Sequence, residues 1–121
     1  MVTLAEQLDG VLSSWGDLGE VVLDAGLDYG DGEPVRITLR KRGNRLVFTD
    51  EGRAFRKAGV ADRAWLEPAE RLVAQEGMNV NRSGAVFVPA ALRPDRDFAD
   101  LVRRLALTSR ALYEELLEFD A

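Results

Sequence analysis

The stretch that decides the fold is Arg45–Val60, which reads RLVFTDEGRAFRKAGV. Its first four residues favour a strand. Thr49 or Asp50 then offers a cap for a short helix, and the Asp50 and Glu51 carboxylates are favoured at a helix N-terminus by the dipole. Gly59 suits the left-handed end of that helix. The stretch therefore predicts a strand, an acidic turn and a short helix, and it assigns the two acids a structural role.

Upstream, residues 21–28 and 35–40 alternate apolar and polar side chains, which is typical of half-buried strands. Gly43–Asn44 is a two-residue hairpin loop. Pairing Leu39 with Phe48 across this loop brings the apolar faces of both strands into register. The sequence thus predicts an antiparallel three-stranded meander.

The register of the first hairpin follows from the same alternation. The apolar residues of both strands share a face only when paired residue numbers sum to an even value. We expect Asp24 opposite Arg40 and Asp28 opposite Arg36, because opposite charges across a ladder contribute roughly 0.2 to 1 kcal/mol each. A salt-bridged polar face is predicted.

Helices are predicted on both sides of the meander. Thr3 and Glu6 form a capping box at the start of an N-terminal helix. Pro68 suits the first position of a second central helix, which Gly77 ends. These signals place one helix before the meander and two short helices after it.

The last third of the chain predicts a short second hairpin over residues 78–88, a loop between Pro89 and Pro94, and a final helix of about 24 residues from Asp95. The expected fold class is α+β, in one domain spanning residues 1–121. Its sheet elements are the antiparallel meander and the short hairpin, packed with the N-terminal, two central and long C-terminal helices.

Composition excludes several kinds of chemistry. The chain has no His and no Cys, which removes imidazole acid–base catalysis, thiolate catalysis and the commonest zinc ligands. Apolar residues make up 46% of the chain and charged residues 31%, a composition typical of folded domains. Neither a signal peptide nor a membrane span is indicated. We expect a cytoplasmic protein with no cofactor, no metal and no membrane partner.

Charge is distributed unevenly along the chain. Residues 1–35 contain eight acids and no Lys or Arg, whereas residues 36–63 contain nine bases and three acids. The two segments either neutralise each other in the fold, or the basic one binds phosphates, or the acidic one mimics nucleic acid. The candidate phosphate contacts are Arg40, Lys41, Arg42, Arg45, Arg53, Arg56 and Lys57.

The order of elements resembles a bacterial and phage family catalogued as domain of unknown function 1828. In that family a strand ends in Thr-Asp-Asp-Gly, and a short helix, a glycine and a C-terminal amphipathic helix follow. The resemblance covers roughly residues 15–119 and implies a setting near phage or mobile elements, in defence or counter-defence. The family implies no established activity. The matching positions are Thr49, Asp50, Glu51, Gly52 and Gly59, with Glu51 in place of the second Asp.

The leading hypothesis is a non-enzymatic interaction or accessory module. The final helix carries apolar residues on more than one stripe, including Ala106, Tyr113 and Leu117, and a helix of this length is expected to overhang a small domain. A protein partner or a homodimer is therefore expected, and the predicted dimer contacts are Leu112, Leu116 and Phe119.

Two alternatives stay open. One is a nucleic-acid-linked protein, either a basic-patch binder or an acidic mimic. The other is an inactive relative of restriction-type nucleases, which resemble this order of helix, three strands and helix. Asp24, Asp28, Asp50 and Glu51 are oxygen ligands of the kind that hold magnesium. The third strand, however, lacks the acid and the lysine that such nucleases require, so no catalytic or metal residue is predicted.

Overall fold

The computed structural model describes residues 3–14, 16, 18–60, 63–91 and 97–119. The described residues combine helices and an antiparallel sheet in an α+β arrangement, as predicted. Four α-helices and five strands are seen in this part of the chain. In chain order they are α1 (Leu4–Ser14), β1 (Leu18–Asp28), β2 (Pro34–Arg42), β3 (Arg45–Thr49), α2 (Arg53–Ala58), a short 3-10 turn η1 (Arg63–Trp65), α3 (Leu66–Ala74), β4 (Asn79–Val80), β5 (Val86–Ala91) and α4 (Phe98–Phe119).

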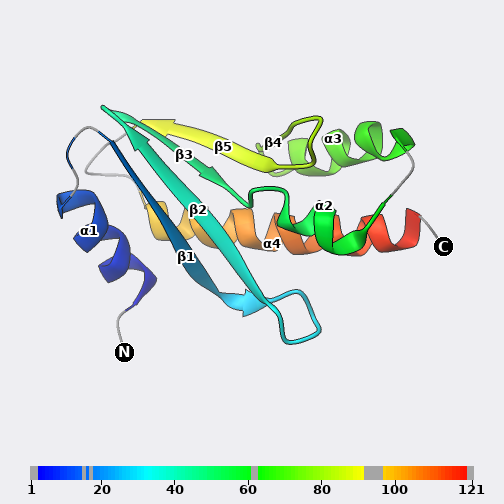
Figure 1. Cartoon of the computed structure of the whole chain (residues 1–121), viewed down its shortest axis with the longest axis horizontal. Coiled ribbons are helices and arrows are strands. Elements are labelled where there is room, and N and C mark those ends of the chain that lie inside the picture. Colours follow the sequence, from blue (N-terminus) through cyan, green and yellow to red (C-terminus); the bar gives the residue numbers. More distant parts are fainter. Residues whose placement is uncertain (1–2, 15, 17, 61–62, 92–96, 120–121) are drawn as a thin grey trace.

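The five strands form one antiparallel sheet in the order β1-β2-β3-β5-β4 (Figure 1). The second hairpin therefore joins the meander through the pairing of β5 with β3, which the sequence did not predict. Pro89 lies inside β5 opposite Val47, and the prediction that it begins a loop is wrong. Since β4 pairs only with Val86 and Phe87, Pro89 lies where β5 has a free edge, and such an edge tolerates proline.

Helix α4 covers one face of the sheet. It packs on β1, β2, β3 and β5 and also contacts α1, α2 and α3. In Figure 1 the strands pass in front of this helix, so the opposite face of the sheet is turned to the viewer. The side chains between sheet and helix are almost fully buried, among them Ile37, Leu39, Phe48, Leu105 and Leu112. The core is thus built around α4.

This arrangement corrects the predicted dimer contacts. Leu112 is 0% exposed and Leu116 is 2% exposed, because both side chains pack in the chain's own core. Neither is free to contact a second copy. The side chain of Phe119 lies outside the described residues. On the second stripe Ala106 is buried, while Leu117 is 46% exposed.

The β2–β3 register is confirmed, with Leu39 opposite Phe48, but the predicted β1–β2 charge pairs are wrong. Asp24 lies opposite Arg36, and Glu20 lies opposite Arg40. The even-sum rule holds, since Val21 pairs with Leu39 on the covered face, but the ladder is displaced by four residue positions.

An irregularity in β1 explains the displacement. Pairing shifts between Asp24 and Asp28, which lies opposite Pro34. Gly26 adopts a φ of +81°, and its amide donates to Oδ1 of Asp24 at 2.9 Å. A left-handed residue of this kind interrupts a regular ladder and favours glycine. The sequence rule assumed an unbroken strand.

The helix ends agree in part with the predictions. The amide of Glu6 donates to Oγ1 of Thr3 at 3.1 Å, which confirms half of the capping box. Gly59 ends α2 in the left-handed region, with a φ of 69°. Pro68 is the third residue of α3, not the first. Helix α4 begins at Phe98, and the predicted start at Asp95 falls outside the described residues. No helix in the described ranges is long and apolar enough to cross a bilayer.

Candidate functional site

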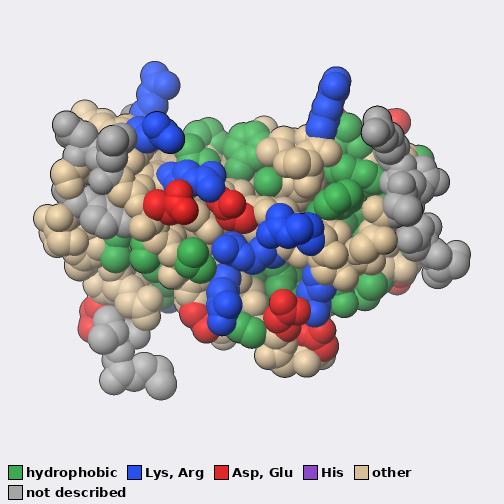
Figure 2. All heavy atoms as spheres, in the orientation of Figure 1, with side chains coloured by type: hydrophobic (Ala, Val, Ile, Leu, Met, Phe, Trp, Pro, Cys, Tyr) green, Lys and Arg blue, Asp and Glu red, His purple; other side chains and the backbone are tan. Residues whose placement is uncertain are grey.

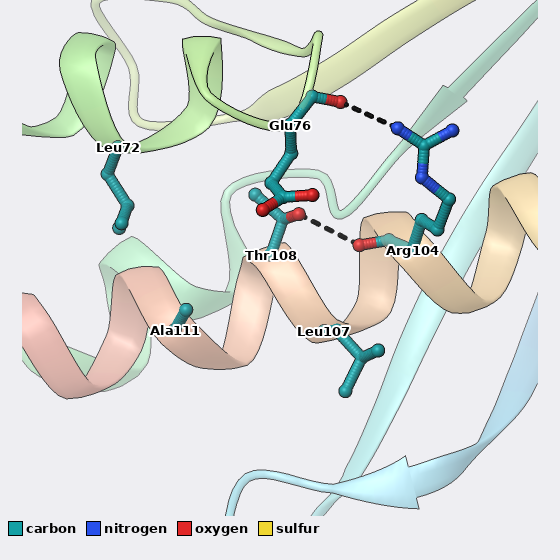
Figure 3. Close-up of a pocket in the computed structure, with 6 residues that line it drawn as sticks. All are labelled: Leu72, Glu76, Arg104, Leu107, Thr108 and Ala111. Carbon is teal, nitrogen blue, oxygen red and sulfur yellow. Dashed lines mark hydrogen bonds between the residues drawn. The ribbon is translucent and has the colours of Figure 1, made fainter.

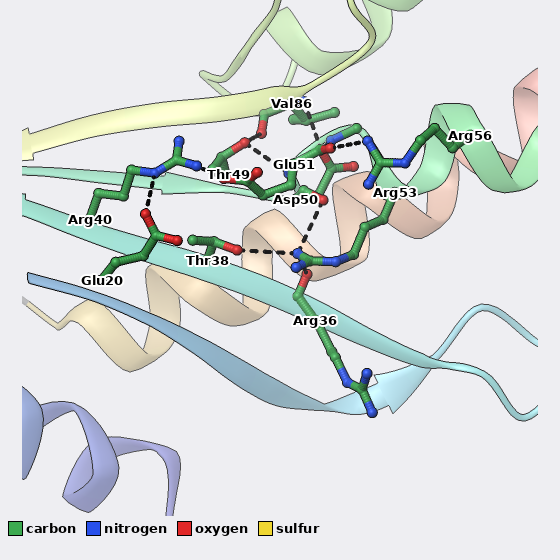
Figure 4. A network of polar contacts seen from close by, with 11 residues as sticks. Glu20, Arg36, Thr38, Arg40, Thr49, Asp50, Glu51, Arg53, Arg56 and Val86 are labelled. Carbon is green, nitrogen blue, oxygen red and sulfur yellow. Dashed lines mark hydrogen bonds and ion pairs between the residues drawn. The ribbon is translucent and has the colours of Figure 1, made fainter.

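Thr49 and Asp50 fasten the turn after β3 to the neighbouring strand (Figure 4). The Thr49 hydroxyl donates to the carbonyl of Val86 at 2.8 Å. Oδ1 of Asp50 accepts from the amides of Gly52 and Val86 at 2.8 and 2.9 Å. The N-cap of α2 is Gly52, and no side chain caps that helix. The predicted cap is therefore wrong, although Asp50 does hold the strand-to-helix turn.

The second oxygen of Asp50 reaches the covering helix. Ser109 of α4 donates to Oδ2 at 2.7 Å, and the hydroxyl of Tyr29 lies 3.1 Å from the Ser109 oxygen. Because Ser109 has one proton and gives it to Asp50, it accepts from Tyr29. Asp50 is 0% exposed, and burial raises the pKa of its carboxyl above the usual value of 3.8 while the hydrogen bonds oppose that shift. The carboxylate is thus occupied on both oxygens.

Glu51 points the other way, toward the uncovered side of the sheet. It is the one non-glycine residue of the described chain with a positive φ, at 59°, a conformation that side chains other than Asn and Asp rarely adopt. Its carboxylate pairs with Arg40, whose Nε donates to Glu20 at 2.9 Å. Arg40 therefore lies between two acids, one of them from the acidic N-terminal segment.

Lys57 is neutralised in the same manner. Its ammonium group pairs with Asp31 at 2.6 Å and also with Glu33. It lies 5.8 and 5.2 Å from the ring centroids of Tyr29 and Tyr113, within cation–π range. The hydrogen bonds to Asp31 and Glu33 raise the pKa of Lys57. Mutual neutralisation of the acidic and basic segments is thus real at Lys57 and Arg40.

The remaining basic candidates differ in their surroundings. Lys41 is 8% exposed on the covered face and donates to the carbonyl of Gly16, so it is not an open cation. Arg53 donates to the carbonyls of Arg36 and Asp50 and to the Thr38 hydroxyl at 3.1 to 3.3 Å. Such neutral acceptors position a guanidinium without cancelling its charge.

Arg42 and Arg45 have no partner among the described residues. Both are exposed, and they face each other directly across the β2–β3 ladder. Like charges in this position are destabilising. With Arg40 and Val47 they line a hollow of about 440 Å³. An anion between them would relieve their repulsion.

We define the open face as the side chains of the sheet that point away from α4, together with Glu51, Arg53 and Arg56 beside them. Figure 2 shows Lys and Arg side chains spread over this side of the molecule, with fewer Asp and Glu among them. Arginines outnumber carboxylates. The charged members are Glu20, Asp24, Arg36, Arg40, Arg42, Arg45, Glu51, Arg53 and Arg56.

The open face also carries apolar side chains. Val47 of β3 and Phe87 of β5 are half-buried, and Val22 of β1 is 48% exposed. Val47 and Phe87 line a second hollow of about 370 Å³, which also includes the polar side chains of Asn81 and Ser83. The open face therefore offers a partly apolar surface beside unpaired guanidinium groups.

A separate groove lies between α3 and α4 (Figure 3). It encloses about 280 Å³ and is lined by Leu72, Leu107 and Ala111, with Glu76, Arg104 and Thr108 at its polar side. Leu107 is 47% exposed, while Arg104 donates to the carbonyl of Glu76 at 3.0 Å. This groove is on the helical side of the molecule, away from the open face.

The four acids considered as magnesium ligands are dispersed. Oδ1 of Asp24 and Oδ1 of Asp28 each accept a local amide, from Gly26 and Gly30 respectively. Asp50 is buried and Glu51 is ion-paired. Over the described part of the chain, no three acidic side chains gather in an arrangement that could hold a metal ion.

Comparison with known proteins adds no relative. No protein-family model matches the chain, and no curated protein or solved structure is significantly similar to it. The resemblance to domain of unknown function 1828 therefore stays a prediction.

Sequence reasoning missed several residues of this region. Ser109 and Tyr29 were not expected near Asp50. Ser109 is 59 residues from Asp50 along the chain, and Tyr29 is 80 residues from Ser109, so no local pattern links them. The sequence placed Phe87 in the second hairpin but did not predict on which face of the sheet its side chain lies. The alternation over Val86–Val88 was the available signal for its orientation, since buried Val86 and Val88 flank half-buried Phe87.

Proposed function

We propose that this protein is a non-enzymatic binding module that holds single-stranded nucleic acid on its open face. The observation that carries the proposal is the pair Arg42 and Arg45, two exposed guanidinium groups opposite each other with no acid beside them in the described structure. A phosphate between them would accept hydrogen bonds from both and remove their repulsion.

The apolar side chains of the open face support a single strand over a duplex. Open sheet faces that bind single strands combine a basic track for the backbone with aromatic or apolar side chains on which unpaired bases stack. Phe87 and Val47 lie beside Arg40 on the same face.

The surroundings of the acids support binding over catalysis. Both oxygens of Asp50 already accept hydrogen bonds that hold the turn. Glu51 is paired with Arg40. A general base or metal ligand needs a carboxylate with a free oxygen in reach of substrate. Asp50 offers none, and Glu51 is held by Arg40 through Oε1.

Fluorescence anisotropy with a labelled single-stranded oligonucleotide tests the proposal. We expect binding that weakens with salt, and the double variant R42A/R45A should reduce the slope of log K against log salt by about 0.7, from the one phosphate that both arginines contact on a single strand. The matched control is R71A/R103A, which removes two exposed arginines from α3 and α4. Equal losses for both variants would contradict a specific role for the open face.

A second candidate is a protein partner on the helical side. Leu107 and Leu117 of α4 are 47% and 46% exposed, and they replace Leu112 and Leu116 as the contacts that a partner or second copy would use. Sedimentation velocity at high micromolar concentration tests self-association. A dimer that L107E/L117E dissociates would support it, and a monomeric wild type would leave only a different protein as the occupant.

The cellular setting belongs to the same proposal. A cytoplasmic location would give the module access to nucleic acid. The resemblance of the Thr49–Gly52 turn to domain of unknown function 1828 adds a setting in phage or mobile-element biology. Neighbouring genes for a nuclease, a toxin or phage proteins would support that setting, and housekeeping neighbours would argue against it.

A further inference from the structure

A third hollow lies at the opposite end of β2 from Arg42. It encloses about 560 Å³ and is lined by Tyr29, Glu33, Pro34, Arg36, Arg53, Arg56 and Lys57. The lining side chains come from the β1–β2 loop, the start of β2 and helix α2. We propose that this hollow is a binding site for a phosphomonoester, a phosphate group attached to its carrier through one oxygen.

Two of its guanidinium groups are fixed in place with donors to spare. One terminal nitrogen of Arg53 donates to the Arg36 carbonyl at 3.1 Å and to Asp50 and Thr38 at 3.3 Å. One terminal nitrogen of Arg56 donates to the carbonyl of Glu51 at 2.5 Å. No described residue engages their other nitrogens. Guanidinium groups held by neutral oxygens keep full charge and lose little freedom on binding an anion.

Arg36 adds a third charge without a partner among the described residues. In Figure 4 it extends from β2 on the side of the sheet where Arg53 lies, with its guanidinium pointing outward. Long arginine side chains reorient at low cost on the surface. Three guanidinium groups suit a phosphomonoester, which carries nearly two negative charges near neutral pH.

The acidic residues at the rim limit the ligand to one phosphate. Glu33 lines the hollow, and both Glu33 and Asp31 pair with Lys57. Lys57 is therefore a wall of the site and not a ligand contact. A second phosphate would approach the Glu33 carboxylate, and the two negative charges would repel each other. A monophosphate is favoured over a diphosphate or triphosphate.

The position of the hollow connects it to the proposed function. Arg36 and Arg42 are six residues apart on β2, about 20 Å along an extended strand. A short single strand on the open face would place its terminal phosphate in this hollow. A free nucleoside monophosphate presents the same chemistry. Binding of a strand's terminal phosphate rests on the proposed function, whereas binding of a free nucleoside monophosphate does not.

The test compares four ligands by NMR titration and anisotropy: inorganic phosphate, a nucleoside monophosphate, and one oligonucleotide with and without a terminal phosphate. The variant R36A/R56A removes two of the three cations and keeps Arg53, which also holds the sheet. We expect the terminal phosphate to tighten binding by at least about tenfold, the effect of one charge-assisted hydrogen bond. R36A/R56A should abolish this difference in affinity. R42A/R45A should weaken the binding of both oligonucleotides equally.

The outcomes separate this inference from the proposed function. Shifts of the Arg36, Arg53 and Arg56 amides with the nucleoside monophosphate, without any oligonucleotide binding, would support the phosphate site and overturn the nucleic-acid proposal. Oligonucleotide binding that ignores the terminal phosphate, with no shifts on adding phosphate or the monophosphate, would overturn the phosphate site alone. R36A/R56A remaining folded by circular dichroism is the required control.

Discussion

The two ends of strand β3 handle charge in opposite ways. At its C-terminal end Asp50 is fully buried, and both of its oxygens accept hydrogen bonds from three parts of the chain. At its N-terminal end Arg45 is exposed opposite Arg42, with no partner in the described structure. The Asp50 carboxyl is surrounded by protein groups whose hydrogen bonds stabilise the fold. The like charges of Arg42 and Arg45 lie opposite each other and do not stabilise the fold. We propose that this second kind of charge marks a binding surface.

This contrast predicts different costs for substitutions at the two ends. Changes at the Asp50 end should lower stability, because buried donors would be left without acceptors. Changes at the Arg45 end should alter binding and leave the fold intact.

The largest effect is expected for Asp50→Ala. It leaves the amides of Gly52 and Val86 and the hydroxyl of Ser109 without their acceptor, and each buried unsatisfied group costs about 1 to 3 kcal/mol. We expect the free energy of unfolding to fall by about 2 to 5 kcal/mol in urea denaturation. Asp50→Asn, which keeps one acceptor oxygen, is the matched control and should cost less. A loss below 1 kcal/mol for Asp50→Ala would show that the network is not structural.

The buried carboxyl also predicts a pH dependence. Burial raises the pKa of Asp50 in the folded state above its usual value of 3.8. Its stabilising contribution is then fully present below that usual value and is lost as pH rises through the folded pKa. The stability of the wild type relative to Asp50→Asn should therefore decrease from pH 3.5 upward to a plateau. A flat difference across this range, measured by thermal or urea unfolding, would contradict the raised pKa.

A smaller effect is expected between the two ends, at the exposed pair of Glu20 and Arg40. Their atoms lie 2.9 Å apart, and the side chains are 59% and 39% exposed. A double-mutant cycle with alanine at both positions should return less than about 1 kcal/mol, as for other exposed ion pairs. Since Glu51 also binds Arg40, the cycle is best repeated in Glu51→Gln. A coupling above 2 kcal/mol would mean that this pair is structural like Asp50.

The smallest effect on stability is expected for R42A/R45A. Both side chains are exposed and unpartnered among the described residues, so the free energy of unfolding should stay within about 0.5 kcal/mol of wild type or rise slightly. Removing the like-charge contact is the reason for a small gain. Loss of more than 1 kcal/mol would place these residues with the structural charges.

Local patterns in the sequence predicted local structure well. The Gly43–Asn44 turn fixed the β2–β3 register because a two-residue loop leaves one alignment of the apolar faces. The first hairpin has a longer loop and a left-handed Gly26, so face alternation alone allowed several even-sum registers and the wrong one was chosen. The pairing of β5 with β3 joins distant segments and left no local signal.

The candidate site was predictable only in part. The basic cluster was visible in the sequence, but which cations lose their charge to an acid depends on contacts such as Arg40 with Glu20 and Lys57 with Asp31. The apolar positions of α4 indicated burial without indicating against what. Leu112 and Leu116 proved to be buried in the core, so periodicity alone could not separate core from interface.

The most direct test of the central claim is a ¹H–¹⁵N titration of the protein with an unlabelled single-stranded oligonucleotide. We expect chemical-shift changes concentrated at the amides of β2, β3 and β5, and largest at Arg42, Arg45 and Phe87, with the amide shifts of Leu72 and Leu107 unchanged. Absence of any shift at millimolar oligonucleotide and low salt, or shifts confined to the α3–α4 groove, would contradict it.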